Sequence, residues 1–122
     1  MDDDEMIAFL MERLLQREGY RVTVFTHAAR ALAAVRDHAE PFDLVITDYN
    51  MPGMSGLEFA RAVRELHPDS PVAITSGYIS EELRAQAPAA GVSELIYKPN
   101  TVEELFAAVD RLARAVLRPP SR

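Results

Sequence analysis

Strand-like and helical patterns alternate along almost the whole chain, and this alternation limits the folds open to it. Apolar residues first recur at helical spacing up to Gly19, and four strand-like runs follow, each succeeded by a helical pattern. These runs span 21–25, 44–46, 71–76 and 94–97. Repeated strand–helix units with short connections require a parallel sheet, helices on both faces and right-handed crossovers. We therefore predict one doubly wound α/β domain over residues 1–117, followed by a tail or linker at 118–122.

The composition excludes several classes of protein. Asp and Glu outnumber Lys and Arg by 19 to 13, which argues against a general surface for nucleic acids or anionic membranes. The chain has no cysteine, and hence neither a thiolate metal site nor a cysteine nucleophile. No window approaches the roughly 18 apolar residues of a membrane span, and the acidic N-terminus is unlike a signal peptide. We expect a cytoplasmic protein without a nucleic-acid or membrane partner, acting on a protein or a cation.

Polar residues suited to phosphoryl and metal chemistry fall at the ends of several predicted elements. Asp2 and Asp3 precede the first helix, and Asp48, Ser76 and Lys98 each end a strand-like run. The carboxyl ends of parallel strands meet at one edge of a sheet, where ligands collect. Carboxylates there suit Mg²⁺, and one of them can attack phosphorus while a cation and a hydroxyl counter the developing charge. Taken singly, each residue has a plainer explanation, as a turn residue, a cap or a partner of a helix dipole.

In this combination and order, the residues resemble the receiver domain of two-component response regulators. The resemblance covers about residues 2–117, and its motifs are Asp2-Asp3, the stretch from Asp48 to Gly56, Ser76-Gly77 and Lys98-Pro99. It implies a flavodoxin-like fold with strand order 2-1-3-4-5. It also implies Mg²⁺ as cofactor and a histidine kinase or phosphotransfer protein as partner. The overall sequence pattern is similar to that of receivers attached to hybrid histidine kinases.

The resemblance gives the acidic residues their roles. It implies that Asp48 is the phosphoacceptor and also a metal ligand. Asp3 would be the principal further side-chain ligand of the metal, with Asp2 assisting. The backbone carbonyl of Asn50 would be another ligand.

The resemblance also implies two residues that contact the phosphoryl group. Ser76 would be the hydroxyl that turns towards it, and we prefer Ser76 to Thr75 because it ends its strand directly before Gly77. Lys98 would be the cation that pairs with the phosphoryl oxygens.

The chain departs from the receiver pattern at its beginning. A receiver opens with an apolar strand leading into the acidic pair, but only Met1 precedes Asp2. That strand is internal in the expected order, so its loss is expected to leave two unpaired strand edges and a smaller core. Three explanations stay open: a start site placed too late, a shortened chain, or a variant that rearranges or borrows from another chain. We expect a marginal monomer, and dimerisation or strand exchange.

Three functions compete. The first is a signalling receiver phosphorylated on Asp48, which is not an enzyme beyond self-phosphorylation and autodephosphorylation. The second is a pseudo-receiver that binds proteins without phosphorylation, favoured by the missing strand and by Leu95, which replaces the aromatic residue that receivers commonly carry three positions before Lys98. The third is an aspartate-nucleophile phosphatase, but such enzymes usually place a second Asp where this chain has Asn50.

Overall fold

A parallel sheet between two layers of helices forms the domain. The computed structural model describes residues 3–25, 28–37, 42–51 and 53–115, so the expected tail at 118–122 lies outside the described residues. The sheet has four strands in the order β1 (Val22–Phe25), β2 (Leu44–Asp48), β5 (Val72–Ser76) and β6 (Val92–Tyr97). All three strand pairs are parallel, which confirms the predicted doubly wound class.

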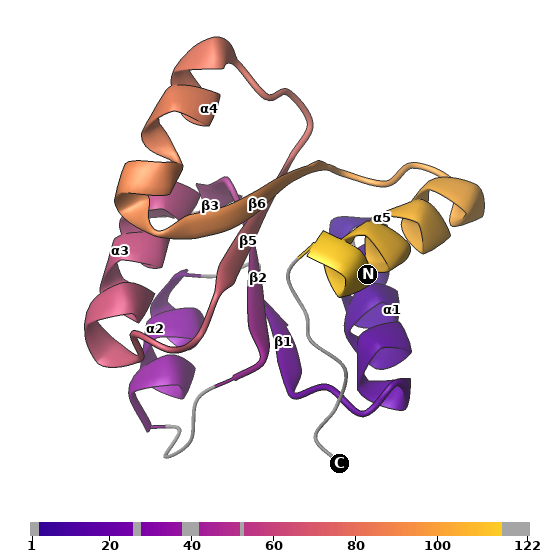
Figure 1. The fold of residues 1–122 in the computed structure, drawn as a ribbon, viewed down its shortest axis with the longest axis horizontal. Coiled ribbons are helices and arrows are strands. Elements are labelled where there is room, and N and C mark those ends of the chain that lie inside the picture. The colour runs from indigo at the N-terminus through magenta and orange to yellow at the C-terminus, as the bar shows by residue number, and fades with distance from the viewer. Residues whose placement is uncertain (1–2, 26–27, 38–41, 52, 116–122) are drawn as a thin grey trace.

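Helices cover both faces of this sheet (Figure 1). One face packs against α1 (Asp3–Arg17) and α5 (Val102–Ala115), as the buried cluster of Met11, Leu15, Ile46 and Leu105 shows. The opposite face is covered by α2 (Ala28–Asp37), α3 (Gly56–Leu66), α4 (Glu81–Gln86) and the short 3₁₀ helix η1 (Pro88–Ala90). No helix within the described ranges is long and apolar enough to cross a membrane.

The apolar run in β2 is buried on both faces, as its unbroken hydrophobicity predicts. Leu44 and Ile46 project into the buried cluster under α1 and α5, whereas Val45 projects from the opposite face of the sheet and packs under α2 and α3. All three residues are at most 1% exposed. Such burial fits a strand with a parallel neighbour on each side and helices above and below.

Strands β1 and β2 pair directly with each other. Their register runs from Val22 opposite Leu44 to Phe25 opposite Thr47. The expectation of two unpaired strand edges at this place is therefore wrong. Direct pairing satisfies the backbone hydrogen bonds of both strands. It also keeps their alternate side chains on the two buried faces of the sheet, so no strand is needed between β1 and β2. In the described part of the chain, the element before β1 is helix α1.

Two shorter features follow local sequence rules. Helix α4 ends at Gln86 and η1 begins at Pro88, because proline lacks the amide hydrogen that a continuing helix needs. After Asp48, strands β3 (Asn50–Met51) and β4 (Met54–Ser55) form a small antiparallel hairpin. This hairpin was not expected from the sequence.

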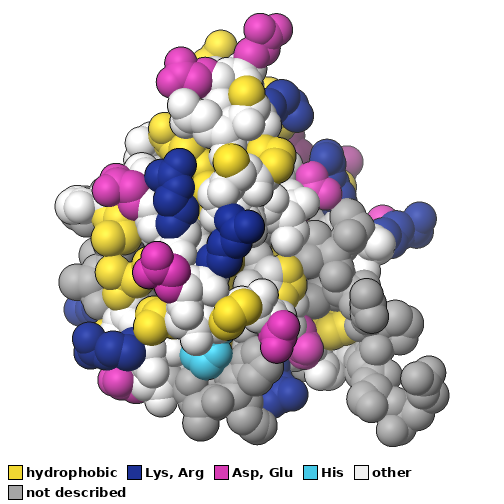
Figure 2. All heavy atoms as spheres, turned by 60° about the vertical axis from the view of Figure 1, so that its left-hand side comes forward, with side chains coloured by type: hydrophobic (Ala, Val, Ile, Leu, Met, Phe, Trp, Pro, Cys, Tyr) yellow, Lys and Arg dark blue, Asp and Glu magenta, His cyan; other side chains and the backbone are white. Residues whose placement is uncertain are grey.

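The outer face formed by α2, α3 and α4 carries charges of both signs. Figure 2 shows Lys and Arg side chains interspersed with Asp and Glu side chains and with hydrophobic ones over this face. Mixed charge of this kind is typical of a solvated helix surface.

Candidate functional site

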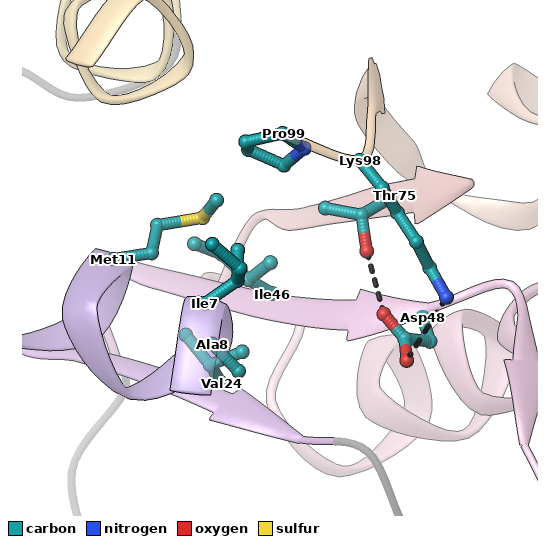
Figure 3. Close-up of a pocket in the computed structure, with 9 residues that line it drawn as sticks. All are labelled: Ile7, Ala8, Met11, Val24, Ile46, Asp48, Thr75, Lys98 and Pro99. Atoms are coloured by element: carbon teal, nitrogen blue, oxygen red, sulfur yellow. Dashed lines mark hydrogen bonds and ion pairs between the residues drawn. The ribbon is translucent and has the colours of Figure 1, made fainter. Parts of the chain in front are cut away.

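The site centres on the carboxylate of Asp48 at the carboxyl end of β2. The Asp48 side chain is 15% exposed, and two groups from neighbouring strands approach it (Figure 3). The Thr75 hydroxyl donates a hydrogen bond to Oδ1 over 2.7 Å. The Lys98 ammonium lies 3.7 Å from Oδ2. Asp48, Thr75 and Lys98 thus come from the ends of three adjacent strands, at the edge where the topology predicts a site.

In this structure the hydroxyl that contacts Asp48 is that of Thr75, and not that of Ser76, which the sequence led us to expect at the phosphoryl group. Asp48 and Thr75 are register partners, so both side chains project from the face that α1 and α5 cover. Ser76, one residue later, projects from the opposite face, and its hydroxyl donates to the carbonyl of Tyr78 over 2.7 Å. The backbone N–H of Tyr78 in turn donates to Ser76 Oγ over 3.3 Å. Ser76 therefore stabilises the loop after β5, and Thr75 contacts Asp48.

The strand pairing of β6 also places Lys98. Ile96 is the register partner of Thr75, and Lys98, two residues further on, has the same orientation. The backbone N–H of Lys98 donates to the carbonyl of Ser76 over 3.0 Å, which extends the parallel pairing past the end of the strand. Pro99 follows and is buried. The Lys98 side chain is 28% exposed, so its charge is partly withdrawn from solvent beside that of Asp48.

The turn after Asp48 is held tightly by the start of α3. The N–H of Gly56 donates to the carbonyl of Tyr49 over 2.7 Å. A Cβ atom at Gly56 would lie 2.8 Å from the Asp48 carbonyl oxygen, so only glycine fits without a shift. Ser55 and Glu58 form a capping box at the start of this helix. The backbone that carries Asp48 is thus fixed from both sides.

The expected metal ligands are only partly described. Asp2 lies outside the described residues, and Asp3 is the first residue of α1, with its side chain outside the described part. Asn50 is exposed in β3, two residues after Asp48. Within the described residues, no group of three or more His, Cys, Asp or Glu side chains could hold a metal ion. The Asp48 carboxylate and the Asn50 carbonyl are hard oxygen donors that fit Mg²⁺, and further oxygens would have to join them.

Helix α1 forms one wall of a pocket beside Asp48. Ile7, Ala8 and Met11 line this pocket from the helix, and Val24 and Ile46 line it from the sheet. Figure 3 shows these apolar side chains next to the polar group formed by Asp48, Thr75 and Lys98. This wall could not be predicted from the sequence, because apolar residues at helical spacing carry no sign of where the helix packs.

The chain is similar to known signalling proteins. It matches the response regulator receiver domain family over residues 1–110. Response regulator receiver protein CpdR of Brucella abortus is 32% identical over 111 residues, which cover 91% of this chain and 90% of CpdR. The DNA-binding transcriptional regulator NtrC of Escherichia coli is 31% identical over 111 residues, which cover 91% of this chain but only 23% of NtrC.

A solved structure of a response regulator has a similar fold. It is a response regulator of Burkholderia pseudomallei that contains a phosphorylated aspartic acid, a calcium ion and citrate. Its TM-score is 0.70 at 31% identity, and the match covers 93% of this chain and 65% of that one.

These similarities bear on two of the expectations from the sequence, the pseudo-receiver alternative and the absence of a nucleic-acid partner. They do not favour the pseudo-receiver over the signalling receiver. The expectation that no nucleic acid is involved gains no support, because NtrC is a DNA-binding regulator. The matched family consists of signalling domains. The chain belongs to the response regulator receiver domain family of two-component signalling proteins.

Proposed function

We propose that this domain accepts a phosphoryl group on Asp48 from a histidine kinase or a phosphotransfer protein. The observation that carries the proposal is the contact of one half-buried carboxylate with a hydroxyl and an ammonium group at the ends of three neighbouring strands. A nucleophilic oxygen, a hydrogen-bond donor and a cation are the groups that phosphoryl transfer requires. Thr75 takes the role that the sequence had suggested for Ser76.

The transfer is an in-line displacement at phosphorus. A carboxylate oxygen of Asp48 forms the new O–P bond as the N–P bond of a phosphohistidine breaks. The electron pair of that bond stays on the imidazole nitrogen, which takes up a proton. The Lys98 ammonium counters the charge on the phosphoryl oxygens, and the Thr75 hydroxyl donates to one of them instead of to Oδ1.

Mg²⁺ is the cofactor that this donor set suits. Asp48, the Asn50 carbonyl, Asp3 and Asp2 are the residues we propose to hold it. When bound, Mg²⁺ neutralises charge on the phosphoryl oxygens. On this proposal residues 1–117 are a cytoplasmic signalling domain, with no catalysis beyond self-phosphorylation and autodephosphorylation.

Intact-mass spectrometry after incubation with acetyl phosphate and Mg²⁺ tests the proposal. We expect wild type to gain the mass of one phosphoryl group, and Asp48→Asn, which keeps the size but not the nucleophile, to gain none. An unmodified wild type would leave a phosphorylation-independent binding module as the function. A modified Asp48→Asn variant would show that the acceptor is a different residue.

A further inference from the structure

The outer edge of β1 is covered by side chains of α1. Strand β1 is the terminal strand of the sheet, with β2 as its neighbour. The N–H of Leu44 donates to the carbonyl of Arg21, so the backbone groups of Arg21 point at β2. Because these groups alternate in direction along a strand, those of Val22 and Val24 point away from the sheet. An edge of this kind normally remains open to water or to another strand.

Two residues one turn apart on α1 contact these outward groups. Glu12 Oε1 accepts a hydrogen bond from the N–H of Val24 over 3.4 Å. Gln16 Nε2 donates to the carbonyl of Val22 over 3.3 Å. We call these two bonds the edge contacts. Both are longer than the usual range of about 2.7 to 3.2 Å, and in each of them a side-chain group faces a backbone group of the complementary kind.

The edge contacts fix the orientation of α1, which is otherwise held against the sheet by apolar packing. Met11 and Leu15 are at most 1% exposed and hold α1 against the sheet. Apolar contact alone is non-directional and resists lifting of a helix more than sliding or rotation. Hydrogen bonds from positions i and i+4 to two fixed backbone groups define both the rotation and the axial position of the helix.

The position of α1 matters for the site because the same helix reaches Asp48. Ile7 and Ala8 line the pocket beside Asp48, and the helix begins at Asp3. A helix of this length moves as a nearly rigid rod, so a shift at Glu12 is transmitted to its first turn about 14 Å away. The edge contacts touch neither Asp48, Thr75 nor Lys98, although Val24 itself also lines the pocket beside Asp48.

We propose that Glu12 and Gln16 are positioning residues for phosphoryl transfer, which act by fixing α1, and with it the acidic start of the helix, against Asp48. The inference rests on the proposed function of Asp48. Loss of the edge contacts would let α1 slide or rotate without unfolding the sheet. The ion site would then be formed less often, while Asp48, Thr75 and Lys98 would keep their own contacts.

The test compares variants that keep or remove the edge contacts. Glu12→Ala and Gln16→Glu remove them, because alanine has no acceptor and an ionised glutamate has no donor. Glu12→Gln keeps an acceptor oxygen of the same reach, and Glu18→Ala removes an exposed glutamate from the turn directly after α1. Gln16→Glu and Glu12→Gln also conserve size, so the comparison does not depend on whether the alanine variant folds.

Two measurements are made on each variant. The first is hydrogen exchange at the Val24 amide without Mg²⁺, which we expect to be about three- to fivefold faster in Glu12→Ala than in wild type and in Glu12→Gln. The second is the Mg²⁺ concentration for half-maximal phosphorylation by acetyl phosphate. We expect it to rise about three- to fivefold in Glu12→Ala and Gln16→Glu, with a smaller change in the rate at saturating Mg²⁺.

Glu18→Ala should behave as wild type in both measurements. Equal Val24 exchange in Glu12→Ala and wild type would overturn the edge contacts themselves. Faster exchange with an unchanged Mg²⁺ requirement would overturn the positioning role. If wild type is not phosphorylated at all, the proposed function of Asp48 fails and the positioning role fails with it, whereas the exchange data still decide whether the edge contacts exist.

Discussion

At the scale of single residues, two unlike groups hold the Asp48 carboxylate. The bond from Thr75 Oγ1 is 2.7 Å long, which is the usual length for a hydroxyl that donates to a carboxylate. The Lys98 ammonium at 3.7 Å is too far for a hydrogen bond and acts as a neighbouring charge. Thr75 therefore fixes the orientation of the Asp48 side chain, and Lys98 sets the local potential.

Replacement of Thr75 by valine should impair phosphorylation more than replacement of Ser76 by alanine. Valine keeps the shape of threonine but cannot donate to Asp48. We expect Thr75→Val to lower the phosphorylation rate about ten- to a hundredfold, because a hydrogen bond to a charged group contributes about 1.5 to 3 kcal/mol. Ser76→Ala should change the rate less than threefold, since its hydroxyl contacts Tyr78. Phosphorylation rates are measured by intact-mass time courses. A larger loss of rate in Ser76→Ala than in Thr75→Val would contradict the assignment of Thr75.

Gly56 offers a second test at this scale. A methyl group at Gly56 would lie 2.8 Å from the Asp48 carbonyl oxygen and 3.0 Å from Tyr49 Cα, so the backbone after Asp48 would have to move. We expect Gly56→Ala to lower the free energy of unfolding by about 1 to 3 kcal/mol in urea denaturation. Gly77→Ala is the matched control, because nothing lies within 4 Å of its Cβ position. A loss of stability as large in the control would refute the steric cause.

At the scale of helices and strands, local chemistry made much of the fold predictable. The capping residues Ser55 and Glu58 indicate the start of α3, and Pro88 indicates the end of α4. The pairing of β1 with β2 and the choice of Thr75 over Ser76 were not predictable. Both depend on strand register, which is set by contacts between segments distant in sequence. A residue at the end of a strand is visible in the sequence, but the face it occupies depends on its neighbours in the sheet.

The start of α5 gives a prediction at this scale. Thr101 Oγ1 accepts from the N–H of Glu104 over 3.0 Å, and the Glu104 carboxylate accepts from the N–H of Asn100 over 2.8 Å. The reciprocal bond thus reaches one residue further back than it does in a standard capping box. We expect Thr101→Ala to cost about 1 kcal/mol of stability and Thr101→Ser to cost less. Urea denaturation checks both, and equal losses would mean that the hydroxyl is not what stabilises the helix start.

At the scale of the whole molecule, the two edges of the sheet differ. Helix α1 covers β1, whereas β6 is the terminal strand on the other side and has β5 as its neighbour. Tyr97, at the end of β6, is 54% exposed. A strand edge with an exposed aromatic residue favours pairing with another chain. The structure thus moves the expected site of self-association from the gap between β1 and β2 to β6.

Dimerisation remains a prediction and is open to a direct test. We expect size-exclusion chromatography with light scattering to show a mass that rises with protein concentration. Tyr97→Lys should shift the equilibrium towards the monomer, because a charge on an edge strand opposes pairing. Tyr78→Lys is a control at an exposed tyrosine outside the strand. A monomer at all concentrations would contradict the prediction, and so would an equal effect of the two variants.

The cover that α1 provides at the edge of the sheet also has a thermodynamic consequence. Asp48 belongs to an interior strand, whereas Asp3 belongs to a helix packed beside the terminal strand. Interior strands open only with global unfolding, and peripheral helices can open locally at a lower cost. The two halves of the proposed ion site thus differ in intrinsic stability. By linkage, an ion bound by both halves would raise the free energy of local unfolding of α1 by an amount that grows with the ion concentration relative to its Kd.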